Sequence, residues 1–250
     1  MNVSGNTILI TGGASGIGLA LAWRFYGKGN QIVICGRRED KLTEASQRMP
    51  GLRTYFCDVG DAADRERFAG QIVEEVPELN VLVNNAGIQR RIDLREQEDW
   101  QLTHSEIAIN LEAPIHLSQL LYPHLSGRPN AAIVNVTSGL SFVPLASVPV
   151  YSATKAALHS FTLSLRHQLR DTGVEVIEII PPAVDTDLQA PGLHTFGVNV
   201  DEFADHVFAE LQAGKLEIAY GTAAISNHSS REELDVIFQR MNESPPFSNE

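Results

Sequence analysis

Tyr151 and Lys155 lie four residues apart in the segment Tyr-Ser-Ala-Thr-Lys, and Ser138 precedes Tyr151 by thirteen residues. Residues four apart share one face of a helix, so the lysine ammonium is expected beside the tyrosine ring. A free phenol titrates near pH ~10, which is too high for efficient acid–base chemistry near neutrality. A cation ~4 Å away, at an effective dielectric constant of ~20, contributes about 4 kcal/mol, enough to lower that pKa by about three units. The pair therefore has the chemistry to move a proton to or from a substrate oxygen. The alternative is a surface tyrosine above a solvated lysine.

A glycine-rich segment near the N-terminus favours the catalytic interpretation. The apolar run 7–10 is followed at once by residues 11–18 (Thr-Gly-Gly-Ala-Ser-Gly-Ile-Gly) and then by a helical pattern of apolar residues. A strand, a glycine-rich turn and a helix in this order bind dinucleotides, because glycines let the backbone approach the pyrophosphate and the helix N-terminus offers unpaired N–H groups. The alternative for the segment is a simple turn.

The end of the second apolar run indicates which dinucleotide is preferred. Residues 31–35 are followed by Gly36, Arg37 and Arg38. Folds that prefer NAD place an acidic residue here to bind the ribose hydroxyl, whereas an arginine pairs with the 2′-phosphate of NADP. The sequence therefore predicts NADP(H) in preference to NAD(H). A solvated helix start is the alternative for the two arginines.

Apolar runs alternate with helical patterns along the chain, which predicts an α/β fold with a doubly wound parallel sheet (a Rossmann fold) in a single domain. We expect this domain to span residues 1–220, with a partly disordered C-terminal extension at 221–250 that includes a short helix near 230–241. The strands are expected at 7–10, 31–35, 53–57, 79–83, 131–137, 174–180 and 216–220, and the helices at 16–28, 38–48, 61–76, 103–125, 150–172 and 201–213.

Composition excludes several other classes of protein. The 250 residues carry a net charge of −12, which provides no basic field for nucleic acid. No apolar run approaches the ~18 residues of a membrane span, and no signal-peptide pattern is present. Cys35 and Cys57 are expected as buried thiols rather than a disulfide, and the eight histidines lack the spacing of a metal site. We therefore expect a cytoplasmic protein without a metal.

Further motifs follow the glycine-rich segment in a fixed order. Asp58-Val59 comes after the third strand, Asn84-Asn85-Ala86-Gly87 after the fourth, and Asn110 precedes Ser138, Tyr151 and Lys155. Together these motifs resemble the short-chain dehydrogenase/reductase family over about residues 5–220. Stretches such as 153–160 and 166–171 are similar to the DltE-like oxidoreductases within it.

The resemblance implies a role for each matched residue. Tyr151 is the general acid/base, Ser138 orients the substrate oxygen, Lys155 also holds the nicotinamide ribose, and Asn110 positions a water. Asp58 and Val59 contact the adenine, and Thr186 holds the carboxamide. The implied cofactor-binding residues are Gly12, Ser15, Gly16, Ile17, Gly18, Arg37, Arg38, Asp58, Val59, Asn85, Ala86, Gly87, Tyr151, Lys155 and Thr186. The alternatives for Asn110 and Ser138 are a capping asparagine and a turn serine.

The predicted function is NADP(H)-dependent interconversion of a carbonyl compound and an alcohol. A non-catalytic NADP-binding redox sensor or scaffold is the alternative, and a redox-neutral epimerase or dehydratase is a second one.

The apolar segment 140–150 and the variable lid 188–200 indicate a hydrophobic substrate, or simply packing. Residues 89–91 (Gln-Arg-Arg) are expected either to contact an anionic group of the substrate or to form a solvated loop.

Two further expectations concern geometry and assembly. Pro182 stands where the family usually has glycine, so the backbone near the nicotinamide is expected to run differently. Helices 103–125 and 150–172 carry more apolar residues than one core face needs. By resemblance they pair subunits, so we expect a homodimer or homotetramer.

Overall fold

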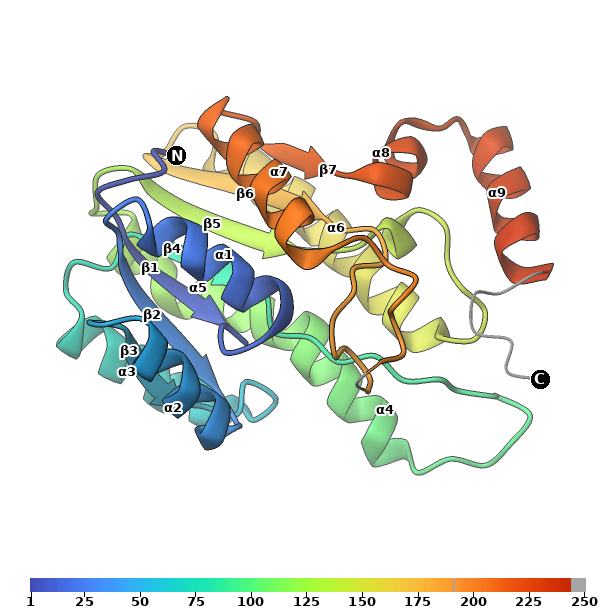
Figure 1. Cartoon of the computed structure of the whole chain (residues 1–250), viewed down its shortest axis with the longest axis horizontal. Helices are drawn as coiled ribbons and strands as arrows, with labels where there is room; N and C mark the ends of the chain where they lie inside the picture. Colours follow the sequence, from blue (N-terminus) through green and yellow to red (C-terminus); the bar gives the residue numbers. More distant parts are fainter. Residues whose placement is uncertain (191, 244–250) are drawn as a thin grey trace.

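The computed structural model describes residues 1–190 and 192–243, and it has a seven-stranded parallel sheet at its centre (Figure 1). The strand order is β3-β2-β1-β4-β5-β6-β7, so the chain leaves β1 in one direction and returns on its other side at β4. The strands are β1 (Thr7–Thr11), β2 (Gln31–Gly36), β3 (Arg53–Phe56), β4 (Val81–Asn84), β5 (Ala131–Val136), β6 (Val174–Ile180) and β7 (Glu217–Ala219).

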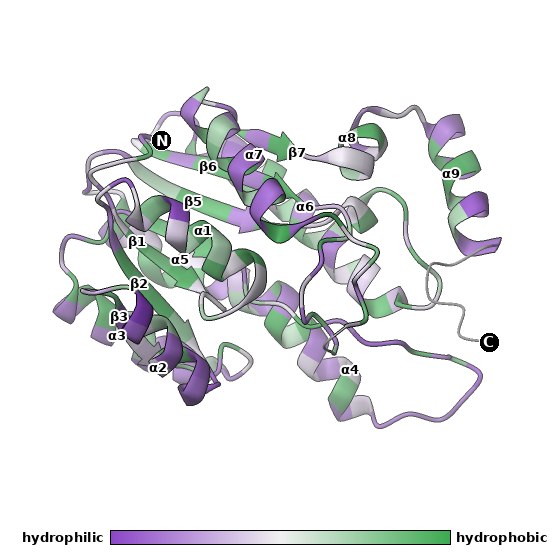
Figure 2. Cartoon of the chain, viewed as in Figure 1, coloured by the Kyte–Doolittle hydropathy of each residue, from purple (hydrophilic) through white to green (hydrophobic). Residues whose placement is uncertain are grey.

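Helices cover both faces of the sheet and bury its side chains. One apolar core lies between the sheet and helices α1, α2 and α7, and a second lies between the sheet and α3, α5 and α6. In Figure 2, α2 is coloured largely as hydrophilic, in keeping with its exposed outer face. The helices are α1 (Gly16–Tyr26), α2 (Glu39–Arg48), α3 (Ala62–Glu75), α4 (Trp100–Ile107), α5 (Ala113–Leu125), α6 (Pro149–Leu169), α7 (Val200–Gln212), α8 (Gly221–His228) and α9 (Arg231–Glu243).

The predicted single-domain, doubly wound α/β fold is confirmed, and the elements begin and end within a few residues of their expected positions. Two differences are informative. The expected helix 103–125 is interrupted by a π-helical segment, Ala108–Glu112. Helix α8 was not predicted, because its sequence, Gly-Thr-Ala-Ala-Ile-Ser-Asn-His, has little apolar periodicity. The helix expected near 230–241 is present as α9, and the expected disorder at the end of the chain concerns residues 244–250, which lie outside the described residues.

Other sequence expectations can be compared directly with the structure. Cys35 and Cys57 are free and buried, as predicted. Within residues 1–190 and 192–243, no helix is both long enough and apolar enough to cross a bilayer. In the same ranges, no cluster of three or more side chains could hold a metal ion.

Candidate active site

A cavity of about 1500 Å³ opens at the carboxyl ends of the strands. In an open parallel sheet ligands bind at this edge, where the strand order reverses between β1 and β4. Of the predicted site residues, Gly18, Asp58 and Asn110 are not part of the cavity wall. The predicted residues that line it are Gly12, Ser15, Gly16, Ile17, Arg37, Arg38, Val59, Asn85, Ala86, Gly87, Ser138, Tyr151, Lys155 and Thr186.

The glycine-rich turn is shaped for close approach of a ligand. Gly16 has φ +52°, a left-handed conformation that glycine adopts without strain, and α1 begins at this residue. A Cβ on Gly18 would lie 2.4 Å from the Nδ2 atom of Asn85, so a larger residue would push the two segments apart. Ser15, the N-cap of α1, makes no side-chain capping bond, which leaves N–H groups of the first turn available to an anion. The turn therefore fits a dinucleotide phosphate.

The turn after β4 is fastened to the glycine-rich turn. The hydroxyl of Thr11 accepts hydrogen bonds from the backbone N–H groups of Asn85 and Ala86, both at 3.0 Å. The Asn85 side chain donates to the Thr11 carbonyl at 2.9 Å. These bonds fix the two walls of the cavity relative to each other.

Two arginines stand at the end of β2. The guanidinium of Arg38 donates to the Ser15 hydroxyl at 2.7 Å, beside the glycine-rich turn. The guanidinium of Arg37 lies 3.8 Å from the carboxylate of Asp58, and both side chains are partly exposed. Asp58 itself lies just outside the cavity wall, between the lining residues Cys57 and Val59. This end of the cavity is therefore positively charged.

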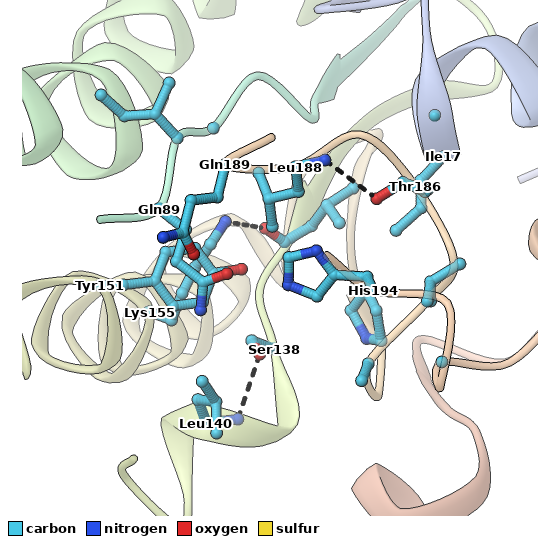
Figure 3. Close-up of a pocket in the computed structure, with 18 of the residues that line it drawn as sticks. Ile17, Gln89, Ser138, Leu140, Tyr151, Lys155, Thr186, Leu188, Gln189 and His194 are labelled. Atoms are coloured by element: carbon cyan, nitrogen blue, oxygen red, sulfur yellow. Dashed lines mark hydrogen bonds between the residues drawn. The ribbon is translucent and has the colours of Figure 1, made fainter. Parts of the chain in front are cut away.

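Tyr151 and Ser138 line the same cavity and are shown in Figure 3. The Tyr151 side chain is only 8% exposed, and burial raises the pKa of its phenol to about 12. The nearby Ser138 hydroxyl lowers this pKa in part, whereas the charge of Glu106 raises it further. The Ser138 hydroxyl is itself held by the backbone N–H of Leu140, which donates to it at 3.1 Å.

Lys155 does not have the effect on Tyr151 that the sequence predicts. Its ammonium donates to the Val136 carbonyl at 2.8 Å and lies 5.6 Å from the centroid of the Tyr151 ring. Burial lowers the pKa of Lys155 to about 8. Burial of the phenol has the largest effect on its pKa and raises it, so the expected lowering of the Tyr151 pKa is wrong for this geometry.

Asn110 sits within the π-helical segment, behind the cavity wall. Its Oδ1 accepts from the Ile88 N–H at 2.9 Å, and its Nδ2 donates to the Ile88 carbonyl at 2.8 Å and to Thr154 at 3.3 Å. A Cβ on Gly87 would lie 3.4 Å from Asn110 Oδ1 and 3.7 Å from Lys155 Nζ, so the two polar groups flank the same glycine. The π segment, a feature frequent at functional sites, turns Asn110 toward this loop.

The segment after β6 also forms part of the cavity wall. Pro181 and Pro182 both line it, and the Pro181 carbonyl accepts from Gly139 N–H at 2.8 Å. All described peptide bonds are trans. Thr186 accepts from the backbone N–H of Leu188 at 3.4 Å, as Figure 3 shows. The Pro-Pro pair is thus accommodated next to the loop that carries Ser138.

The sequence analysis does not identify Glu106, and it names Gln89 and His194 only as parts of two segments, residues 89–91 and the lid 188–200. In Figure 3, Gln89 gathers with Tyr151 and Lys155 on one side of the cavity, and His194 lies opposite. Gln89 is 6% exposed, and its carbonyl oxygen has no partner among the described residues. Glu106 on α4 is fully buried, and burial raises the pKa of its carboxyl to about 7. Glu106 is buried by residues distant in sequence, so no local pattern identifies it.

The C-terminal helices also form part of the cavity wall. Thr222 and Ala223 of α8 and Ile237 and Met241 of α9 line it. Asn242 fastens α9 to the segment after Ser138, since its side chain accepts from Ala146 N–H at 2.6 Å and donates to the Pro144 carbonyl at 3.1 Å. Residues beyond 220 therefore belong structurally to the site.

A partly buried histidine–carboxylate pair supports the loop that carries Ser138. The Nδ1 atom of His159 on α6 lies 2.9 Å from the carboxylate of Glu178 on β6. The Thr137 hydroxyl donates to the same carboxylate at 2.7 Å. The hydrogen bond to Glu178 raises the pKa of His159, against the effect of burial. The pair thus anchors the residue directly before Ser138.

Comparisons with known proteins agree with this architecture. Residues 6–195 match the short chain dehydrogenase family. The chain is 49% identical to the oxidoreductase DltE of Bacillus subtilis over 97% of its own length and 98% of that protein. A short chain dehydrogenase from Burkholderia cenocepacia, solved with NADP, superposes with a TM-score of 0.81 at 25% identity over 95% and 99% of the two chains. One from Burkholderia phymatum, solved with NAD, superposes with a TM-score of 0.83 at 22% identity over 100% of both.

Proposed function

Because the chain belongs to the short-chain dehydrogenase/reductase family of oxidoreductases, we propose that it moves hydride between NADP(H) and a carbonyl or secondary alcohol substrate. One observation carries this proposal. The hydroxyls of Ser138 and Tyr151 and the ammonium of Lys155 line the same cavity as the glycine-rich turn. A proton-transfer group and a dinucleotide cradle therefore share one space.

Tyr151 serves as the general acid in reduction and as the general base in oxidation. A bound nicotinamide cofactor supplies the hydride or accepts it. In reduction the carbonyl carbon gains the hydride and its oxygen takes the phenolic proton of Tyr151, while the Ser138 hydroxyl hydrogen-bonds that oxygen. Lys155 remains largely protonated near neutrality because its pKa is about 8. Its charge stabilises the Tyr151 phenolate that proton transfer leaves behind.

Asn110 acts on this chemistry from behind the cavity wall. Its bonds to Ile88 hold the segment beside Lys155, and any water it positions there would link the lysine to solvent. It is therefore proposed as a positioning residue.

NADP(H) is the proposed cofactor because the end of β2 has no acidic side chain and two arginines. Arg38 lies against Ser15, where a 2′-phosphate can be reached from the ribose of a nucleotide on the glycine-rich turn. Asp58 already faces Arg37, which leaves Arg38 as the stronger candidate. The proposed cofactor contacts remain those of the glycine-rich turn, the turn after β4, Val59 and Thr186.

The competing function is a cofactor-binding sensor or scaffold without turnover. Product analysis with oxidised NADP and a panel of alcohols separates the possibilities. Stoichiometric formation of reduced cofactor and carbonyl product is expected. Tight cofactor binding with no product would support the sensor, and a rearranged product without net cofactor reduction would support a redox-neutral enzyme.

We further propose a homodimer or homotetramer that pairs through α4–α5 and α6. Ile107, Leu111, Phe161 and Leu165 are only half-buried in the single chain. Leu117, Leu158 and Leu169, in contrast, pack into the core and are not available for pairing. Light scattering that gives the mass of one chain at micromolar concentration would contradict this assembly.

A further inference from the structure

The charge around the cavity is opposite in sign to the charge of the chain. The whole protein carries a net charge of −12. Among the described residues, five arginines and Lys155 line the cavity, against the two carboxylates of Glu98 and Asp187. An acidic protein that gathers cations around one cavity is arranged to attract an anionic ligand there.

The cofactor end of the cavity accounts for only part of this charge. Arg37 and Arg38 lie at the end of β2, where they contact Asp58 and Ser15. Arg90 and Arg240 line the cavity from other segments, the loop after β4 and helix α9. Within the described part of the chain, no carboxylate lies within salt-bridge distance of either guanidinium. The charge of Arg90 does act on the buried carboxyl of Glu106, so Arg240 is the cation with the fewer competing charges.

Both arginines border the segment that follows Ser138. The loop that carries Arg90 is bonded to this segment, because the N–H of Ile92 donates to the Ser147 carbonyl at 3.2 Å. Arg240 precedes Met241, which packs into the small apolar cluster that contains Tyr151. The two cations therefore lie on the substrate side of the cavity.

Apolar residues also line the cavity around Tyr151. Leu145 forms an apolar cluster with Tyr151, and Leu140, Leu188 and Met241 pack against it; all of these residues line the cavity. An apolar surface with cations at its edge fits a ligand that has a hydrocarbon body and a charged end.

We propose that the substrate is a carbonyl compound whose hydrocarbon body ends in an anionic group, and that Arg240, together with Arg90, binds that group. This inference rests on the proposed function and specifies its substrate class. A carboxylate, a sulfonate and a phosphate share the required chemistry, because each accepts charge-assisted hydrogen bonds from a guanidinium. One such bond changes affinity by about tenfold to a hundredfold.

The test compares unbranched aldehydes with ω-oxo carboxylates of the same chain length, over several lengths. Parallel arms use the matching sulfonate and phosphate. We expect kcat/KM to favour the anionic member by about tenfold or more at one chain length. Arg240→Gln should reduce the ratio of anionic to neutral kcat/KM about tenfold, and Arg240→Lys should restore part of it.

Arg231→Gln is the matched control. Arg231 is an exposed arginine on the same helix, pairs with Asp235, and is not part of the cavity wall. If Arg231→Gln lowered the ratio of anionic to neutral kcat/KM as much as Arg240→Gln does, the positive charge of α9 as a whole would explain the effect. That result would overturn the proposal. Equal kcat/KM values for the neutral and anionic series in the intact protein would also overturn it.

A binding measurement separates this inference from the proposed function. Calorimetric titration of the NADPH-loaded protein with saturated alkanoates needs no turnover. If Arg240→Gln bound alkanoates more weakly and no aldehyde reacted, the proposed anion site would be supported and the proposed oxidoreductase activity would be contradicted. Turnover of neutral aldehydes without Arg240-dependent alkanoate binding would keep the oxidoreductase and reject the anion site.

Discussion

The carboxyl group of Glu106 is buried beside Tyr151, and its negative charge raises the pKa of the Tyr151 phenol. No hydrogen bond of ordinary geometry reaches either carboxyl oxygen from the described residues. The backbone N–H of Arg90 and the charge of its side chain both lower the pKa of Glu106, but they offset only part of the effect of burial. The pKa of Glu106 therefore rises to about 7. Two titrating groups of the site are therefore coupled.

The first prediction concerns stability. The pKa of Glu106 rises from 4.5 to about 7 on folding, so the folded state holds a proton that the unfolded state has lost in this range. The free energy of unfolding must then fall as pH rises from 4.5 to about 7, by at most about 3 kcal/mol. Glu106→Gln removes the titrating carboxyl, so its free energy of unfolding should not fall over this range. The variant should therefore be more stable than the intact protein above pH 7, but not below pH 4.5. Urea unfolding at both ends of the range measures this, and an equal effect at both ends would contradict it.

The second prediction concerns the pH profile of catalysis. Without the negative charge of Glu106, the pKa of Tyr151 should fall, so alcohol oxidation by Glu106→Gln should reach its plateau at lower pH than in the intact protein. Glu112→Gln is the control, because Glu112 is exposed in the π-helical segment of the same helical run. Superimposable profiles for the intact protein and Glu106→Gln would show that the two groups are not coupled.

Cofactor preference gives the third prediction. Arg38→Gln should weaken NADPH binding about tenfold to a hundredfold, because one charge-assisted bond to the 2′-phosphate is lost. NADH, which lacks this phosphate, should bind with little change. Lys41→Gln provides a matched loss of charge on α2, at a partly exposed residue that pairs with Glu44. If Arg38→Gln weakened the binding of NADPH and of NADH to the same extent, a contact between Arg38 and the 2′-phosphate would be contradicted.

The His159–Glu178 pair gives the fourth prediction. Folding raises the pKa of His159 above its ordinary value of 6.5. The pair with Glu178 therefore contributes its full stabilisation to the folded state below pH 6.5, and this contribution is lost as pH rises through the pKa of His159 in the folded protein. His159→Gln should lower the free energy of unfolding by about 1–3 kcal/mol at acidic pH and by less at alkaline pH. His167→Gln alters an exposed histidine of the same helix and should have little effect. A pH-independent loss in His159→Gln would argue for packing rather than charge.

The sequence predicts those parts of the molecule whose signals are local. The buried strands, the turn at Gly12–Gly18 and the spacing of Tyr151 and Lys155 each depend on neighbouring residues, and the fold they predict is confirmed. Glu106 lies between Ser105 and Ile107 on an ordinary helical stretch, and only its packing near Tyr151 of α6 makes it unusual. The position of Arg240 at the cavity likewise depends on how Asn242 fastens α9.

The pKa of Tyr151 shows why composition and spacing do not determine electrostatics. The four-residue spacing predicts the lysine correctly as a neighbour of the ring, at 5.6 Å from its centroid. The direction of the shift depends on how completely the phenol is buried, and burial is a property of the whole fold.

The most direct test of the proposed chemistry is the rate of NADPH oxidation with a panel of aldehydes and ketones, measured for the intact protein and for Tyr151→Phe. The substitution removes one buried hydroxyl and keeps the ring. We expect turnover with at least one carbonyl compound, a loss of about a hundredfold or more in Tyr151→Phe, and NADPH binding that is largely retained. Turnover that persists undiminished in Tyr151→Phe, or tight NADPH binding with no turnover of any carbonyl compound, would contradict the account.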